Sequence, residues 1–236
     1  MLKIDRTDLA AGSLKYLAKL TQVVTSSDDP KATAASRWDT KSSKEFSVVK
    51  DALRKMCSGI ERCMYCEDSL GTDIEHFWPK SKYPHHAFSW ENYLLACSHC
   101  NSNEKREDLP LDEAQEPLAI NPSLDDPLEH LALLPSGEYV CRTVQGIASV
   151  ELFGLNRPQL VSARRVAWSG FAALAKEVWM AHQKGRKSEA ELLNAAYKLP
   201  HGSVLVTMIQ YAHMGTPIMD DELTTALCYV SEMNCQ

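Results

Sequence analysis

Two pairs of cysteine residues have the spacing of metal ligands. They are the segments Cys63-Met64-Tyr65-Cys66 and Cys97-Ser98-His99-Cys100, two CxxC pairs with thirty residues between them. Each pair can hold one side of a tetrahedral zinc ion through a tight turn. Because four thiolates leave no coordination position for water, such a zinc would be structural, and its binding energy would stabilise the fold. The pairs alone also suit a zinc ribbon that binds protein or nucleic acid without catalysis.

Polar side chains follow a distinctive order between the pairs and directly after them. The segment Thr72–Lys80 reads TDIEHFWPK, so that Glu75 directly precedes His76. Asn92 stands just before the second cysteine pair, and Asn101 follows that pair at once. In this order the elements resemble the HNH endonucleases, whose pattern is CxxC, an acid-His dyad, a central Asn, and CxxC followed by His or Asn.

The resemblance extends into the flanks of the motif. The motif itself covers about a fifth of the chain. The flanking stretches are Trp90–Lys105, Ile120-Asn121-Pro122, Asp125-Asp126-Pro127 and Leu155-Asn156-Arg157. With them, the chain resembles the HNH nuclease subunits of Septu and retron-associated antiphage defence systems. That resemblance implies an ABC- or SMC-like ATPase subunit as partner.

The resemblance implies a ββα-metal fold and assigns a role to each motif residue. The dyad would lie on the first strand, Asn92 in the connecting loop, and Asn101 at the start of the helix after the second strand. His76 would be the general base, a role that suits an imidazole with an unperturbed pKa near 6.5. Asn92 would position it through a hydrogen bond. Glu75 and Asn101 would hold a catalytic Mg²⁺ or Mn²⁺, with Asp73 as the alternative carboxylate.

These residue types fit phosphodiester hydrolysis. The reaction needs a water deprotonated near neutral pH and a cation near the leaving oxygen, because charge accumulates there. Two residues depart from the common family pattern. Glu75 stands where many members have Asp, and Asn101 stands where the family name expects His. Both still offer an oxygen ligand.

Other polar and aromatic side chains near the dyad have two interpretations each. The histidines are His85, His86 and His99, and the aromatic residues are Trp78, Phe88 and Trp90. The histidines could contact phosphate or metal, although a solvated loop is the preferred interpretation. The aromatic residues could stack on bases, but a small zinc unit needs an aromatic core. The remaining cysteines are predicted to be small buried hydrophobes: Cys57, Cys141, Cys228 and Cys235.

Composition limits the class of protein. A chain of 236 residues with 44% hydrophobic residues can bury a full core in one or two domains. No stretch approaches the roughly 18 apolar residues of a membrane span, and the first residues lack the apolar core of a secretory signal. We therefore expect a cytoplasmic protein without membrane association. In that reducing compartment, paired cysteines bind metal more often than they form disulfides.

The charge balance argues against strong autonomous binding of nucleic acid. The formal net charge is −6, whereas affinity for phosphates comes largely from lysine and arginine. Basic residues do gather beside the motif, namely Lys80, Lys82, His85, His86, Lys105 and Arg106. They could form a small positive site, with a partner subunit supplying the rest.

The pattern along the chain predicts an α+β fold, mainly helical around a zinc-braced ββα-metal core. Residues 1–58 form a helical arm: one helix carries Leu14, Leu17, Leu20 and Val24, Ser26–Pro30 breaks it, and another covers Lys44–Ser58. This arm either packs on the core or docks on another subunit. Residues 59–112 form the nuclease core.

The second half is predicted to be a small β/loop segment followed by a helical cap. In residues 113–155, Leu131–Leu134 and Tyr139–Val144 flank a Ser136-Gly137 turn and suggest a hairpin. Residues 156–236 are helical, with Asn156 as N-cap of a long helix that runs towards His182. Further helices are expected at Ser188–Lys198, Ser203–His213 and Asp220–Met233. The basic clusters Arg164-Arg165 and Lys184–Lys187 are interpreted as solvated faces.

Together these features predict a metal-dependent HNH endonuclease that acts on nucleic acid, with DNA favoured over RNA, as an antiphage effector. The alternative is a zinc-stabilised scaffold with a vestigial site. A vestigial site should have lost its base or its ligands, whereas Glu75, His76, Asn92 and Asn101 are all present. A stand-alone restriction-type or homing nuclease would carry a basic sequence-reading module, and the sequence shows none.

Overall fold

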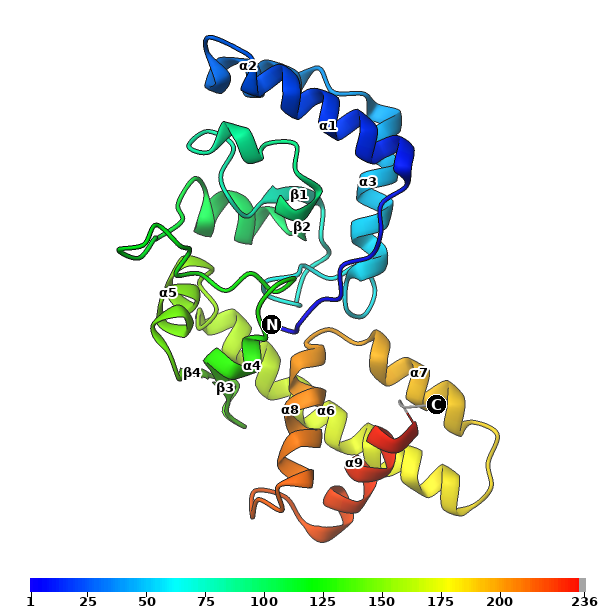
Figure 1. Ribbon diagram of the computed structural model, residues 1–236. Coiled ribbons are helices and arrows are strands. Elements are labelled where there is room, and N and C mark those ends of the chain that lie inside the picture. Colours follow the sequence, from blue (N-terminus) through cyan, green and yellow to red (C-terminus); the bar gives the residue numbers. More distant parts are fainter. Residues whose placement is uncertain (234–236) are drawn as a thin grey trace.

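The computed structural model describes residues 1–233 and shows an α+β chain arranged along one long axis (Figure 1). The N-terminal helices are α1 (Ala11–Thr25), α2 (Pro30–Asp39) and α3 (Ser43–Met56). The central part contains β1 (Asp73–His76), η1 (Pro84–His86), η2 (Trp90–Asn92), β2 (Tyr93–Ala96) and η3 (His99–Lys105). Then follow α4 (Pro127–His130), β3 (Leu131–Leu133), β4 (Tyr139–Cys141) and α5 (Val144–Leu152). The last elements are α6 (Pro158–Gln183), α7 (Glu189–Lys198), α8 (Gly202–His213) and α9 (Asp221–Met233).

The N-terminal arm contains a helix that the sequence analysis missed. The predicted break at Ser26–Pro30 is real, but its last residues begin α2. The Asp29 side chain accepts a hydrogen bond from the Ala32 amide at 3.0 Å, and Pro30 occupies the first turn. Aspartate at the N-cap and proline directly after it are a strong helix start. The break therefore separates two helices.

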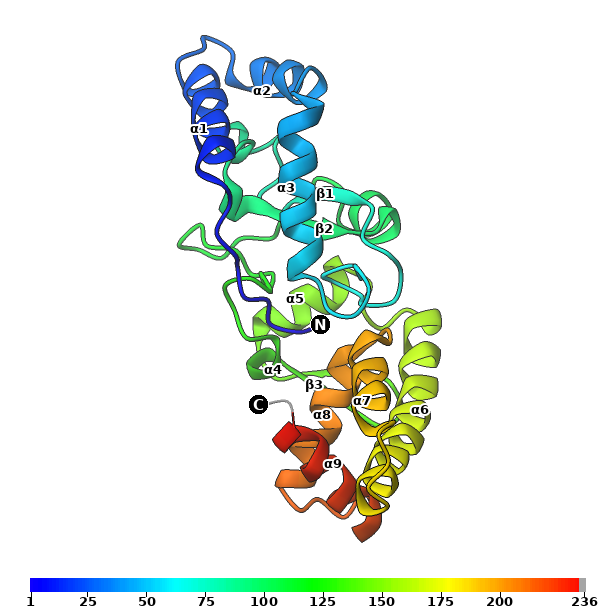
Figure 2. The same ribbon diagram turned by 90° about the vertical axis from the view of Figure 1, so that its right-hand side faces the viewer.

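The arm packs on the central part of the molecule, the first of its two predicted roles. The helix α3 buries Phe46, Val49, Leu53 and Met56, residues three and four apart that share one helical face. This helix contacts β2, while α1 and α2 contact η1. Figure 2 shows α3 running across the β1–β2 hairpin.

The strands β1 and β2 pair antiparallel, with Asp73 opposite Ala96 and His76 opposite Tyr93. The predicted helix after the second strand is present as the π-helix η3. The Arg106 amide donates to the Asn101 carbonyl at 2.8 Å, five residues back. In such a helix, residues five apart share a face. Cys100 and Lys105 accordingly both face the interior.

The β3–β4 hairpin confirms the predicted hairpin, although both strands are shorter than expected. Val144, placed in the second strand, instead begins α5, where the Thr143 hydroxyl accepts a hydrogen bond from the Gly146 amide at 3.1 Å. The turn requires Gly137, whose φ is +89° and whose added Cβ would lie 2.2 Å from the Val161 carbonyl oxygen.

The C-terminal helices α6 to α9 lie close to their predicted bounds, and α6 packs against α7, α8 and α9. The predicted N-cap was wrong. Arg157 precedes the helix, and the Asn156 amide instead binds Tyr139, accepting from its N–H at 2.9 Å and donating to its carbonyl at 2.8 Å. Because this amide satisfies both backbone groups of a strand residue, it is not available to cap α6.

Three of the four single cysteines, Cys57, Cys141 and Cys228, are half-buried and pack against the core, and Cys235 lies outside the described residues. Among residues 1–233, no helix combines the length and the hydropathy needed to cross a membrane.

Arg164 was predicted on a solvated face, but its side chain is 1% exposed. Its guanidinium donates to the carbonyls of Gly137 at 2.6 Å and Leu155 at 2.7 Å, and it lies 4.5 Å from the centre of the Tyr139 ring. The buried guanidinium of Arg164 thus links α6 to the β3–β4 turn through Gly137, and to the segment directly before α6 through Leu155.

We expect Arg164→Ala to lower the free energy of unfolding by about 3 to 5 kcal/mol, because buried carbonyls would lose their donors. The neighbouring exposed Arg165 provides the matched control, and Arg165→Ala should change stability by about 0.5 kcal/mol or less. Urea unfolding followed by circular dichroism measures both. Equal stability of the two variants would contradict this role of Arg164.

Candidate active site

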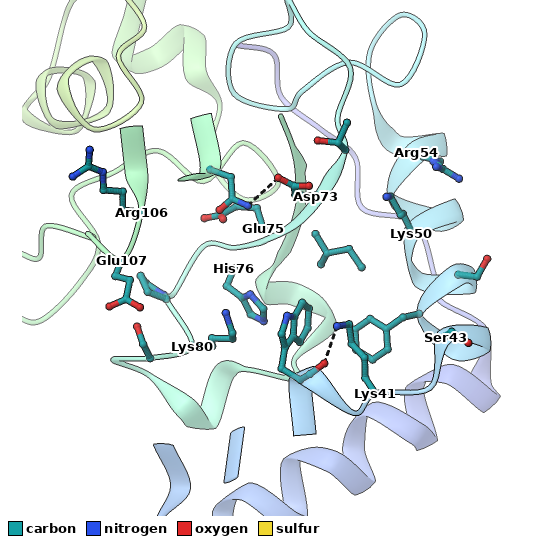
Figure 3. A pocket seen from close by; sticks show the side chains of 18 residues that line it. Lys41, Ser43, Lys50, Arg54, Asp73, Glu75, His76, Lys80, Arg106 and Glu107 are labelled. Atoms are coloured by element: carbon teal, nitrogen blue, oxygen red, sulfur yellow. Dashed lines mark hydrogen bonds between the residues drawn. The ribbon is translucent and has the colours of Figure 1, made fainter. Parts of the chain in front are cut away.

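Three of the four predicted catalytic residues, Glu75, His76 and Asn101, line one cavity of about 650 Å³ between the arm and the β1–β2 hairpin, together with Asp73. Asp73, Glu75 and His76 come from β1, and Asn101 comes from η3. Figure 3 shows these strand residues facing the arm across the cavity. The structure therefore brings together every predicted catalytic side chain except Asn92.

His76 is held as a neutral imidazole. Its Nε2 lies 3.0 Å from the Ala87 carbonyl oxygen, which can only accept, so Nε2 carries the proton and donates. Burial, reinforced by the positive charge of Lys80, lowers the pKa of His76 to about 3. In this tautomer Nδ1 keeps its lone pair. The geometry thus assigns Nδ1 as the atom that can accept a proton.

Aromatic rings fix the orientation of His76. The Trp38 ring on α2 meets the imidazole edge-on, with ring centres 4.3 Å apart, and the Tyr93 ring lies 5.3 Å away. The Tyr93 hydroxyl also donates to the Ala87 carbonyl at 2.8 Å. This packing leaves His76 only 6% exposed.

Asn92 acts on the loop around His76. Its Oδ1 accepts from the Trp78 amide at 2.7 Å, and its Nδ2 donates to the carbonyls of Trp78 at 3.0 Å and His86 at 2.9 Å. It therefore joins the segment just after His76 to the segment just before Ala87. Asn92 can position the imidazole through the loop that supplies Ala87, and no hydrogen bond links the two side chains among the described residues.

Glu75 is buried and ion-paired. Its Oε1 lies 2.7 Å from the Nζ of Lys105, which also donates to the His76 carbonyl at 2.9 Å. Burial raises the pKa of Glu75, and the charge of Lys105 opposes that rise. Since a carboxylate has two oxygens, this contact leaves one for a cation. Lys105 was expected in an exposed positive site, but its side chain is fully buried.

Asp73 and Asn101 form a second group of oxygen ligands beside Glu75. The Asn101 amide nitrogen lies 3.4 Å from Asp73 Oδ2, which also accepts from the Ser98 hydroxyl at 3.0 Å. Asp73 and Glu75, two residues apart on a strand, share a face. Carboxylate and amide oxygens with room for water suit a divalent cation such as Mg²⁺.

The four cysteines of the CxxC pairs form a site that fits zinc. Their sulfur atoms all lie within 4.8 Å of one another and are buried, and Cys66 Sγ is 3.9 Å from Cys97 Sγ. A tetrahedral zinc with Zn–S bonds near 2.3 Å needs sulfurs about 3.8 Å apart. Hydrogen bonds from neighbouring thiols lower the pKa of Cys97, whereas burial raises the pKa of Cys63.

Comparisons with known proteins agree with this geometry. Residues 63–107 match the family model described as HNH endonuclease. The segment is an HNH domain. It contains both cysteine pairs and every predicted catalytic residue, so the resemblance read from the motif is confirmed over these residues.

Two curated proteins are similar to this chain over a longer stretch than this domain. The Septu protein PtuB of Bacillus mycoides (strain KBAB4) is 31% identical over 147 residues, covering 49% of this chain and 49% of that protein. The Septu protein PtuB of Bacillus thuringiensis is 31% identical over 116 residues, covering 46% of this chain and 41% of that protein. The chain thus spans about half the length of the curated relatives it matches. The Septu resemblance is confirmed to that extent, and the retron resemblance stays a prediction.

The side chains around the HNH domain mostly follow the preferred interpretations. Phe88 and Trp90 are buried in the core, Trp78 is partly buried, and His85, His86 and His99 are exposed or nearly so. The sequence analysis missed Trp38, the role of Lys105, and the α3 residues that line the cavity. The regular spacing of polar residues on α3 was visible, but spacing does not say which face meets the active site.

The electrostatics of His76 can be tested by imidazole nitrogen shifts in NMR. We expect the His76 signals, identified by their loss in His76→Gln, to remain those of a neutral ring from about pH 8 to 5. In the unfolded chain His76 takes up a proton near its ordinary pKa of about 6.5, whereas in the folded chain it does so only near 3. The free energy of unfolding should therefore decrease as the pH falls from about 6.5 towards 3. A titration midpoint near 6.5 in the folded protein would contradict the assignment.

The zinc site can be tested with matched cysteine variants. We expect Cys97→Ser to lose zinc and to unfold or aggregate, because structural zinc contributes about 10 to 16 kcal/mol in zinc fingers, as much as a domain's whole stability. Cys141→Ser, which changes a half-buried cysteine outside the cluster, should keep its metal. Mass spectrometry of bound metal and thermal unfolding give the readouts. A folded, zinc-free Cys97→Ser protein would exclude a structural zinc.

Proposed function

We propose that this chain is a metal-dependent endonuclease that hydrolyses phosphodiester bonds of nucleic acid, with DNA favoured over RNA. The observation that carries the proposal is that Glu75, His76 and Asn101, all within the HNH domain, line one cavity. Each of these residues supplies a group that the reaction needs.

In the proposed reaction His76 is the general base. Its Nδ1 accepts a proton from the attacking water, and the Ala87 carbonyl holds the ring in the required tautomer through Nε2. The low pKa of His76 keeps the ring ready to accept a proton, although the same desolvation makes it a weaker base in the ground state.

Glu75 and Asn101 are the proposed ligands of a catalytic Mg²⁺ or Mn²⁺, with Asp73 as a further carboxylate beside them. When bound, a divalent cation supplies positive charge at the leaving oxygen and the phosphoryl group. Lys105 holds Glu75 by one oxygen and so limits how the carboxylate can turn. Lys105 is a positioning residue in this proposal.

We also propose that the chain is the effector subunit of an antiphage defence system that works with an ABC- or SMC-like ATPase. The similarity to Septu protein PtuB over about half of each chain supports this. The net charge of −6 fits a nuclease that binds nucleic acid weakly by itself and is delivered by a partner. Thiolate zinc ligands fit a reducing compartment, so the proposed location is cytoplasmic.

Cleavage assays test this function. Purified protein is incubated with supercoiled plasmid and with single-stranded RNA, in Mg²⁺, Mn²⁺ or EDTA, alone and with the proposed ABC- or SMC-like ATPase partner. We expect metal-dependent cutting that falls by about 10² to 10⁴-fold in His76→Ala, because a general base contributes a factor of that size.

The matched control is His85→Ala, which removes an exposed histidine that does not line the cavity. This variant should cut at nearly the wild-type rate. If wild type remains inactive with the partner while it holds zinc and is folded, the vestigial scaffold becomes the better account. If both variants lose activity equally, His76 is not the base.

A further inference from the structure

The cavity has a second wall that lies outside the HNH match. Ser43, Ser47, Lys50 and Arg54 all line it. Their spacing of four, three and four residues places them along one stripe of α3. Figure 3 shows Lys50 pointing from α3 towards the strand that carries Asp73. The arm therefore contributes directly to the surface that a substrate would meet.

The sequence had predicted that the positive charge of the site comes from the HNH segment, and most of that charge is not available. Lys105 is buried against Glu75, and Lys82 is paired with Asp108 at 3.1 Å. Of the six basic residues expected there, only Lys80 and Arg106 line the cavity. A phosphate-binding site would need further cations from elsewhere.

The arm supplies such cations. Lys41 and Lys50 line the cavity, and with Lys80 they form a group of three lysines without a carboxylate partner among residues 1–233. The Nζ of Lys41 donates to the Trp38 carbonyl at 2.7 Å and lies 4.2 Å from the Trp38 ring centre, and the Nζ of Lys80 lies 5.6 Å from the same ring centre. Trp38, which covers His76, thus lies next to two of the three lysines.

Three acidic residues also line the cavity, namely Asp73, Glu75 and Glu107, and none of them forms a salt bridge with these lysines among residues 1–233. Glu75 is paired with Lys105, whereas Asp73 accepts only from the neutral groups of Ser98 and Asn101 and keeps its charge for a cation. Arg54 on the same stripe is different, because Asp51 and Glu61 lie 2.9 Å and 3.3 Å from its guanidinium. The cavity-lining cations without a salt bridge among residues 1–233 are therefore Lys41, Lys50, Lys80 and Arg106, and the arm supplies two of the four.

We propose that the N-terminal arm forms half of the substrate site, with Lys50 and Lys41 binding backbone phosphates of the nucleic-acid strand that is cut with His76 as general base. The proposal rests on the proposed function for the identity of the ligand. Lysine contacts to phosphates carry no base information, so this wall reads the backbone and not the sequence. It also reconciles a net charge of −6 with a nucleic-acid substrate, since the positive charge is local.

The proposed binding of phosphates by the arm can be tested by measuring nucleic-acid affinity under conditions in which no cleavage occurs. The parent is His76→Ala, and the probes are a fluorescein-labelled DNA duplex and its single strand, with affinity measured by anisotropy over a series of KCl concentrations. Adding Lys50→Gln should weaken binding about tenfold at low salt, the loss expected for one charge-assisted contact. It should also reduce the slope of log Kd against log salt by about one.

Matched variants distinguish phosphate binding by Lys50 from a general effect of removing a lysine from α3. Lys44→Gln removes an exposed lysine of α3 that does not line the cavity, and it should leave both affinity and slope unchanged. Lys50→Arg should keep the slope, because it keeps the charge. Combining Lys41→Gln with Lys50→Gln should reduce the slope by about two. Thermal unfolding verifies that each variant is folded.

The outcomes also distinguish this inference from the proposed function. If wild type cuts plasmid but Lys50→Gln binds like Lys44→Gln, the phosphate wall is wrong and the nuclease stands. If Lys50-dependent binding is found while no metal or partner produces cutting, the wall stands and the catalytic proposal fails. Failure of the parent to bind either probe in a salt-dependent way would overturn the wall.

Discussion

The gathering of four cysteine sulfurs within 4.8 Å is the constraint on which the geometry of the candidate active site depends. The first cysteine pair precedes β1 and the second directly follows β2, so one metal would tie together the two ends of the hairpin. The hairpin itself is short, with four residues in each strand, and two strands alone are marginally stable in water. The thiol cluster lets so small a sheet hold Glu75 and His76 in fixed positions. It also anchors η3, which begins inside the second cysteine pair and carries both Asn101 and Lys105.

Around this cysteine cluster, burial and nearby charges set the charge state of each proposed catalytic group. His76 is neutral because its surroundings are apolar and its nearest charges are positive. Glu75 has the opposite requirement, and it receives a buried cation from Lys105. Removing one partner from such a pair leaves an uncompensated charge in the interior, which costs several kcal/mol. The π turn of η3 makes this pairing possible, because it places Lys105 on the same inward face as Cys100. Zinc ligation and the electrostatics of the dyad are therefore linked through one short helix.

The N-terminal arm covers one side of the candidate active site. Its packing on η1 and β2 places Trp38 over His76 and aligns one stripe of α3 with the cavity. The same packing excludes water from the imidazole and adds lysines near the dyad. An arm that served only to complete the core would not require unpaired cations on the face that lines the cavity. The acidic body of the protein and the local positive site are thus properties of different surfaces.

The sequence alone determined the HNH segment, the cysteine cluster and most of the helices. The cysteine spacing, the Glu75-His76 dyad and the two asparagines indicated an HNH domain, because each depends on residues close together in the chain. The helices α6 to α9 followed from apolar periodicity for the same reason. Local signals failed where a side chain had two suitable uses: Asn156 could have capped α6, but it binds the backbone of Tyr139. Arg164 and Lys105 looked like solvated charges, and only the fold supplied the acceptors that allow both to be buried. The meeting of Trp38 and Lys50 with His76 was likewise decided by tertiary structure, since sequence periodicity defines the faces of a helix but not what each face packs against.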